Sequence, residues 1–294
     1  MATNVWHMLR DALTEVGELH ENVATGGSAT TVVDSKLAGS DDDWNNGTVI
    51  ITRDSAGAAA APEGEFALVT DYASGTGTIT VAASALSAAP ASGDNYGVAT
   101  NYYPMVQVVR AINRGLQMMG DIPQVDLATL TTASNQTEYA ASLAWKRHPP
   151  FRIDMQGKLS DTNDYKWHKM SDWEYTPATA GNTGLIILPQ LVTGRLLRIW
   201  FEDAHAAVND FDDVIYEGFF PEMVLRETVY NLLLWKNGET GGADASVINM
   251  LNNAEEKREE VKRETSVWKP PRHSKLMILG NKINRDQFTY PDPP

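Results

Sequence analysis

An acidic run near residue 40 has the clearest pattern of metal-type oxygen ligands in the chain. Asp41-Asp42-Asp43-Trp44-Asn45-Asn46-Gly47 carries carboxylate or amide oxygens at alternate positions, as the start of a calcium loop does. An EF-hand loop also needs Gly at its sixth position and Glu at its twelfth, where this chain has Asn46 and Thr52. These departures favour a solvated turn leading into a strand over a calcium site.

Four aspartates close to two tryptophans point to a second kind of chemistry, the binding or hydrolysis of carbohydrate. The residues are Asp154, Asp161, Asp164, Trp167, Asp172 and Trp173. A glycosidase needs two carboxylates at a fixed separation, and the sequence fixes none. Carboxylates in loops between strands are usually solvated, and tryptophans there more often fill a β core. A carbohydrate-binding or hydrolysing protein therefore stays as an alternative, which a glycan-binding screen tests.

Other signatures of catalysis do not occur in the sequence. There is no cysteine, which excludes disulfides, thiolate metal sites and cysteine nucleophiles and fits a reducing cytosol. The six histidines form no His-Glu-x-x-His arrangement, and there is no Gly-x-Ser-x-Gly elbow, phosphate loop or dinucleotide fingerprint. We therefore expect a structural protein rather than an enzyme, with no catalytic residue, cofactor or metal.

The charge and hydropathy of the chain restrict its partners. The formal net charge is -14 over 294 residues, which opposes wrapping DNA or docking on an anionic membrane. The first residues alternate polar and apolar at helical spacing, unlike a secretory signal, and no apolar run approaches the roughly 18 residues of a membrane span. We expect no membrane partner and only passing contact with DNA.

Apolar spacing and proline or glycine boundaries predict the helices that position these groups. An N-terminal stripe runs from Val5 to Val16, Pro104 opens the clearest helix, and Pro221 opens another that ends near Gly238. The predicted helices cover about residues 5–16, 104–120, 221–238 and 243–265.

Two regions have the composition and alternation of strands. The first, residues 26–99, is rich in Gly, Ala, Ser, Thr and Asp and contains short β-type runs separated by turn signals. Its runs lie at residues 48–52, 66–69, 78–81 and 96–98. The second region, residues 129–203, contains further runs at 138–143, 151–155, 184–188 and 195–201.

The predicted fold class is α+β, with a helical body, two β-rich regions and an extended C-terminal arm. The N-terminal, central and two C-terminal helices make the body, which spans residues 1–25 and 100–265 and includes the β-region 129–203. Residues 26–99 form an inserted all-β domain, and residues 266–294 form the arm.

The C-terminal arm is basic on an acidic protein and is interrupted by prolines. Lys269-Pro270-Pro271-Arg272 opens it, and an apolar patch, Leu276-Met277-Ile278-Leu279, follows. Such an arm suits an acidic groove on a partner or a neighbouring subunit, and the alternative is that it folds back on its own subunit. The candidate partner-binding residues are Lys269, Arg272, Lys275, Leu276, Ile278 and Leu279.

The order of these segments resembles that of a known class of viral protein. The β-region resembles β-modules inserted in tailed-phage structural proteins, through the stretches Ala24–Ser28, Trp44–Thr48, Val69–Tyr72, Thr76–Val81 and Ala91–Tyr96. The flanking helices and the arm resemble phage head-to-tail adaptor, or connector and neck, proteins.

The resemblance implies a virion protein that forms a homo-oligomeric ring, usually a dodecamer, beneath the portal protein. Its arm would reach the portal, its other face would meet tail or neck proteins, and it would lie in the virion neck after assembly in the host cytoplasm. Carboxylates lining the channel would repel the phosphate backbone, so DNA would slide through during ejection. The alternative within the same class is a tail-tube, baseplate or decoration protein.

Overall fold

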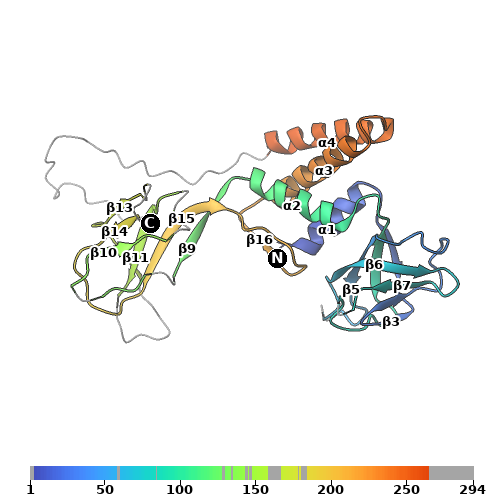
Figure 1. Ribbon diagram of the computed structural model, residues 1–294, viewed down its shortest axis with the longest axis horizontal. Coiled ribbons are helices and arrows are strands. Elements are labelled where there is room, and N and C mark those ends of the chain that lie inside the picture. Colours follow the sequence, from blue (N-terminus) through green and yellow to red (C-terminus); the bar gives the residue numbers. More distant parts are fainter. Residues whose placement is uncertain are drawn as a thin grey trace.

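The computed structural model describes residues 3–57, 60–83, 85–127, 130–133, 135–142, 145, 148–157, 167–177, 179 and 184–264. In this structure the molecule is elongated, with a helical hub in the middle and a β region at each end (Figure 1). The hub consists of α1 (Val5–Glu15), α2 (Met105–Met118), α3 (Pro221–Glu239) and α4 (Ala245–Glu264).

The first β region is an antiparallel sheet of seven strands in the order β2-β8-β5-β6-β7-β4-β3. Its strands are β2 (His20–Val23), β3 (Gly26–Ser28), β4 (Thr31–Val33), β5 (Thr48–Arg53), β6 (Phe66–Ala73), β7 (Thr78–Val81) and β8 (Asn95–Ala99). The two strands at the ends of this order, β2 and β3, are consecutive in the chain. Between them, the N–H of Ala24 donates to Asp94 O at 2.8 Å and the N–H of Thr25 to Val33 O at 2.7 Å. The sheet therefore closes on itself, and we call it the barrel.

Strand β5 shows how the barrel attaches to the hub. Val49 and Ile51 belong to the core inside the barrel, whereas Ile50 between them belongs to the core of the hub. Because side chains alternate along a strand, one strand supplies both cores and needs an unbroken apolar run. All of these side chains are buried.

The hub is a layer of helices in which α3 lies between α2 and α4, while α1 packs on α2 and α3. Gly115 lets α2 approach α3 closely, since a Cβ at this position would lie 3.0 Å from Thr228 Oγ1 and 3.3 Å from Val224 O. Because α3 is covered on several sides, its buried residues extend around the helix. They are Val224, Leu225, Glu227, Thr228, Val229, Leu232, Leu233 and Lys236.

The second β region, which we call the sandwich, contains a four-stranded sheet in the order β12-β11-β15-β9 and a three-stranded sheet in the order β10-β14-β13. The strands are β9 (Asp121–Asp126), β10 (Glu138–Ala140), β11 (Arg152–Gln156), β12 (Trp167–Lys169), β13 (Glu174–Thr176), β14 (Leu185–Ile187) and β15 (Leu197–Ala204). A separate core holds it together, with Tyr139, Trp145, Ile153, Ile186 and Ile199 among its buried members.

A short ribbon fastens the N-terminus to the segment that returns from the sandwich. It pairs β1 (Thr3–Asn4) with β16 (Val214–Ile215), which leads into α3. In the same returning segment, Asn113 of α2 exchanges two hydrogen bonds of 2.8 Å with the backbone of Val208. These contacts tie the base of the sandwich to the hub.

The predicted helical body is wrong. The four helices hold 27% of the described residues and the strands hold 30%, arranged in four antiparallel sheets. Several strands have only two to four residues, too few to show alternation, and residues 121–126, for which no element was predicted, form strand β9. Proline is tolerated at this position because β9 is at the edge of its sheet.

Candidate functional site

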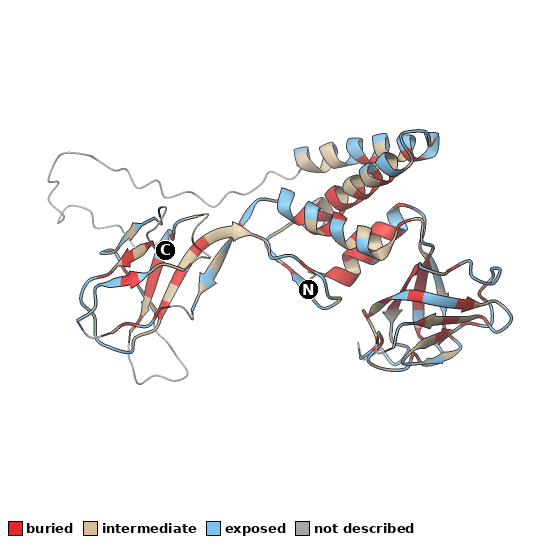
Figure 2. Cartoon of the chain, viewed as in Figure 1, coloured by how far each residue is buried: buried red, intermediate tan, exposed pale blue. Residues whose placement is uncertain are grey.

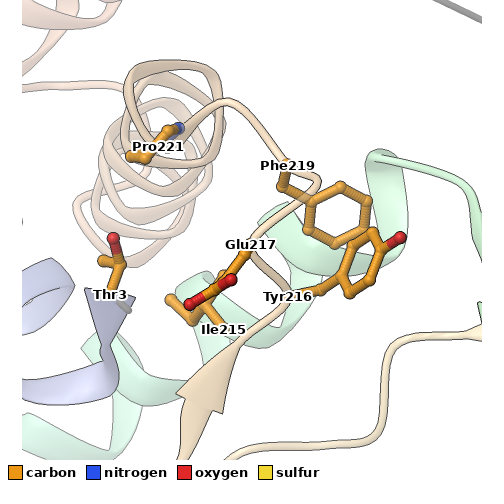
Figure 3. Close-up of a pocket in the computed structure, with 6 residues that line it drawn as sticks. All are labelled: Thr3, Ile215, Tyr216, Glu217, Phe219 and Pro221. Carbon is orange, nitrogen blue, oxygen red and sulfur yellow. The ribbon is translucent and has the colours of Figure 1, made fainter. Parts of the chain in front are cut away.

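A pocket lies where the N-terminal ribbon meets the start of α3 (Figure 3). It is lined by Thr3, Ile215, Tyr216, Glu217, Phe219 and Pro221. Its volume of about 50 Å³ is enough for a few water molecules, whereas ligand pockets usually measure several hundred Å³. The Tyr216 and Phe219 rings meet edge to face at 5.5 Å, so the pocket is a packing gap between aromatic groups rather than a substrate site.

The acidic run at residues 41–43 uses its carboxylates to shape a turn before β5. Asp41 Oδ1 accepts hydrogen bonds from the Ser74 N–H and O–H, both at 2.7 Å, which lower the pKa of Asp41. Asp43 Oδ2 accepts from the Ser40 N–H at 2.6 Å, and Asp42 Oδ1 accepts from the Asn45 side chain at 2.6 Å. The three carboxylates therefore accept hydrogen bonds from donors on three different residues. Within the described ranges, no three acidic or histidine side chains group as metal ligands would.

The aspartates near the tryptophans are placed very differently from one another. Asp154 lies in β11 and is only 2% exposed, in contrast to the expected solvated carboxylate. Asp172 is exposed in the turn between β12 and β13, and Trp173 packs against the core of the sandwich. Asp161 and Asp164 lie outside the described residues.

Asp154 joins two strands through a set of residues that we call the Arg–Trp face: Arg152, Asp154, Trp167, Arg198 and Trp200. Arg152 Nε donates to Asp154 Oδ1 at 2.7 Å, and Trp200 Nε1 donates to Asp154 Oδ2 at 2.8 Å. The guanidinium of Arg198 lies 3.9 Å from the centre of the Trp167 ring, a cation–π stack. Both Asp154 oxygens are thus occupied and one face of Trp167 is covered, which suits a rigid strand clamp better than a general base with a sugar platform.

The hub contains a buried carboxylate that is neutralised from α4. Glu227 of α3 is 2% exposed, and its Oε1 lies 2.8 Å from Lys262 Nζ and 3.7 Å from Arg258 Nε. The Arg258 guanidinium also lies 4.0 Å from the centre of the Tyr230 ring. A buried carboxylate requires such partners, so two cations of α4 are held against α3.

A second ion-pair group links α1 to the other helices of the hub. Glu15 Oε2 lies 2.8 Å from Arg226 of α3 and 3.4 Å from Lys257 of α4. Burial alone would raise the pKa of Glu15, but the hydrogen bond and charge of Arg226, with help from Lys257, lower it below its usual value. Lys257 nevertheless stays 54% exposed, so it contacts Glu15 from the surface of the hub.

An aromatic cage around Lys236 sits where the barrel joins the hub. The Nζ of Lys236 lies 3.6 Å from the centre of the Tyr102 ring, 5.6 Å from that of the Trp235 ring and 5.9 Å from that of the Tyr103 ring. Glu239 pairs with the same Nζ at 2.7 Å. Tyr102 and Tyr103 lie on the segment between β8 and α2, so the cage holds this connection against α3.

The interaction residues predicted from the sequence all belong to the C-terminal arm and lie outside the described residues. They are Lys269, Arg272, Lys275, Leu276, Ile278 and Leu279, and their role stays a prediction. The structure also exposes outward-facing residues on α2 and α4 that were not among the predicted interaction residues. Apolar and charged residues spaced by four, such as Val106, Arg110, Arg114 and Met118, were the available signal.

Comparisons with protein families and with curated proteins give no match. No protein-family model matches the chain, and no curated protein matches it with significance. Among the described helices, none combines the length and the apolar character needed to cross a membrane.

Proposed function

We propose that this chain is a structural protein of a tailed-phage virion that forms a ring at the head-to-tail junction. The ring would give DNA a channel and offer a docking face to the tail. Its partners would be the portal protein, tail or neck proteins, and further copies of itself, and it would carry out no catalysis. The residues that resemble phage adaptor proteins and the basic C-terminal arm support this role.

The observation that carries the proposal is the presence of separate hydrophobic cores in the barrel, the hub and the sandwich. The two β regions lie at opposite ends of the hub (Figure 1), so each can meet a different partner while the hub fixes their spacing. A protein that joins two assemblies needs separate faces on a rigid spacer. The pocket of about 50 Å³ beside α3, in contrast, is too small for a substrate.

The acidic balance suits a channel for DNA. With a net charge of -14, carboxylates on the wall of a ring would repel the phosphate backbone and keep DNA from adhering. Replacing channel carboxylates by lysine should then slow DNA ejection and make it more dependent on salt.

Electron microscopy of the purified chain, alone and mixed with the portal protein from the same genome, tests the proposal. We expect a closed ring with a central channel, attached to the portal in the mixture. Stacked tubes or isolated spikes would support a tail or decoration protein instead. Binding to a glycan array, with no ring in either sample, would support the carbohydrate alternative.

Deletion of the residues after Thr265 tests the role of the arm separately. The truncated chain should keep the circular dichroism spectrum of the hub and the β regions but no longer sediment with the portal. A truncated chain that binds the portal as well as the full chain does would show that the arm is not the attachment.

A further inference from the structure

The two outer helices of the hub present opposite sides of one layer. Because α3 lies between them, the outer ridges of α2 and α4 point away from each other. Figure 2 shows exposed residues on the outer sides of α2 and α4 and mainly buried and intermediate residues along α3. In a ring, each copy could therefore contact one neighbour through α2 and the other neighbour through α4.

The outer ridge of α2 is basic with apolar ends. It consists of Val106, Arg110, Arg114 and Met118, spaced by four residues and opposite the buried side of the helix. Val106 is 53% exposed and Met118 is 65% exposed, unusually high for side chains of this kind. There is no acidic residue in α2, and in the part of the chain that the structure describes neither arginine forms an ion pair.

The outer ridge of α4 is predominantly acidic, because two of the four cations of this helix are turned inward. Arg258 and Lys262 are directed toward Glu227, whereas Lys257, which lies 3.4 Å from Glu15, is 54% exposed. The ridge left outside consists of Ile248, Asn252, Glu256 and Glu260, again spaced by four, with Glu255, Lys257, Arg263 and Glu264 exposed beside it. Ile248 is an exposed apolar side chain on a helix that is otherwise polar outside.

The two ridges match in spacing and in sign. Four residues of helix rise about 6 Å, so the separation of Arg110 from Arg114 equals that of Glu256 from Glu260. Both helices run from the barrel end toward the sandwich end (Figure 1), and a small rotation about a ring axis keeps them roughly parallel. In that register Val106 lies beside Asn252, at the same end as Ile248.

We propose that the outer ridge of α2 in one copy docks on the outer ridge of α4 in the next copy, pairing Arg110 with Glu256 and Arg114 with Glu260. The two surfaces are different, so the contact is head-to-tail, and repeated rotation closes a ring. This inference rests on the proposed ring and names the subunit interface within it. Charge complementarity selects a second copy of this chain as the occupant of both ridges.

Charge reversal in two complementary variants tests the interface. The first variant is Arg110→Glu with Arg114→Glu, and the second is Glu256→Lys with Glu260→Lys. Each alone would place like charges together, and we expect its self-association, measured by sedimentation at low salt with and without portal protein, to weaken on the order of 100-fold. An equal mixture of the two should associate again, because the variants can alternate around the ring.

Matched reversals on the β regions serve as controls, with circular dichroism to check folding. Arg53→Glu with Lys169→Glu, and Glu21→Lys with Asp71→Lys, change the net charge equally at exposed positions away from both ridges. The self-association of these control variants should stay within about twofold of that of the unmutated chain, since distant surface charges are largely screened. Equal losses in these controls would mean that net charge, not the ridges, drives association.

The outcomes separate this interface from the proposed function. Rings that form on the portal despite both reversals would overturn the α2–α4 contact and leave the ring intact. Failure of the mixture to restore association, or an unmutated chain that never associates, would also overturn it. A glycan or an unrelated protein bound through Arg110 and Arg114 would point to another occupant.

Discussion

The barrel and the sandwich are both small antiparallel β structures, but they treat their sheet edges in opposite ways. In the barrel, residues 20–28 pair with β8 on one side and β4 on the other, and this closes the sheet. In the sandwich, β9 and β12 stand at the ends of the four-stranded sheet. Closure satisfies backbone groups within the module, whereas an open edge must be protected by other means.

The sandwich protects and stiffens its sheet through side chains. Pro123 lies in the edge strand β9, where it removes a donor that another strand could use. The Arg–Trp face clamps β11 to β15 through Asp154. We conclude that the closed sheet and its own core stabilise the barrel. The sandwich depends more on the side-chain contacts of the Arg–Trp face and on its attachment to the hub.

Isolated fragments would break this comparison most decisively. A fragment of residues 19–100 should fold alone, because its sheet is closed around its own core. A fragment of residues 121–204 should aggregate or unfold, because it keeps open edges and loses the hub. Circular dichroism melts and light scattering would measure both. Two fragments that melt equally well as monomers would contradict the distinction.

Substitutions of two neighbouring isoleucines test separately the stability of the barrel and the attachment of the barrel to the hub. Ile51→Ala should destabilise the barrel by about 3 kcal/mol, since it empties a fully buried site in the barrel core. Ile50→Ala should lower the stability of the full chain by about 2 kcal/mol but barely affect the 19–100 fragment, because Ile50 packs on the hub. Urea unfolding of the full chain and the fragment gives both numbers, and equal effects of the two changes in the fragment would refute the assignment.

Removing the charge of Asp154 tests the clamp in the sandwich. Asp154→Asn should cost about 1–2 kcal/mol, because Arg152 loses its charged partner while Trp200 can still donate to the amide oxygen. The cost stays moderate because Arg152 is 46% exposed and can be solvated by water. Glu174→Gln, at an exposed position of the same module, is the control and should change the unfolding midpoint by less than the error.

Acid should weaken the barrel through Asp94 by a small amount. Burial opposes ionisation of Asp94, but hydrogen bonds from the N–H groups of Ser55 and Ala91 outweigh it and lower its pKa. A carboxyl whose pKa is lowered by folding stabilises the protein above its unfolded pKa of about 3.9 and loses this contribution as pH falls through the folded pKa. The 19–100 fragment should thus lose stability below about pH 4, and Asp94→Asn should flatten that loss in urea titrations.

The positions of the helices and of the longer strands could be predicted from the sequence because their signals are local. Apolar spacing and prolines located α2 and α3 within a few residues, and short β-type runs between turn signals located β5 and β7. The turn at residues 41–47 was predicted from its Asp and Asn content. Each of these signals lies within one segment of the chain.

Only the tertiary structure decided how those elements combine. The closure of β2 and β3 into a barrel, the burial of Asp154 and the inward direction of Arg258 and Lys262 all depend on residues distant in sequence. Asp154 meets Trp200 46 positions along the chain, and Glu227 meets Lys262 from another helix. A local sequence pattern indicates which face of a helix or strand is apolar. It does not record which partner covers that face, because the partner is set by packing across the whole chain.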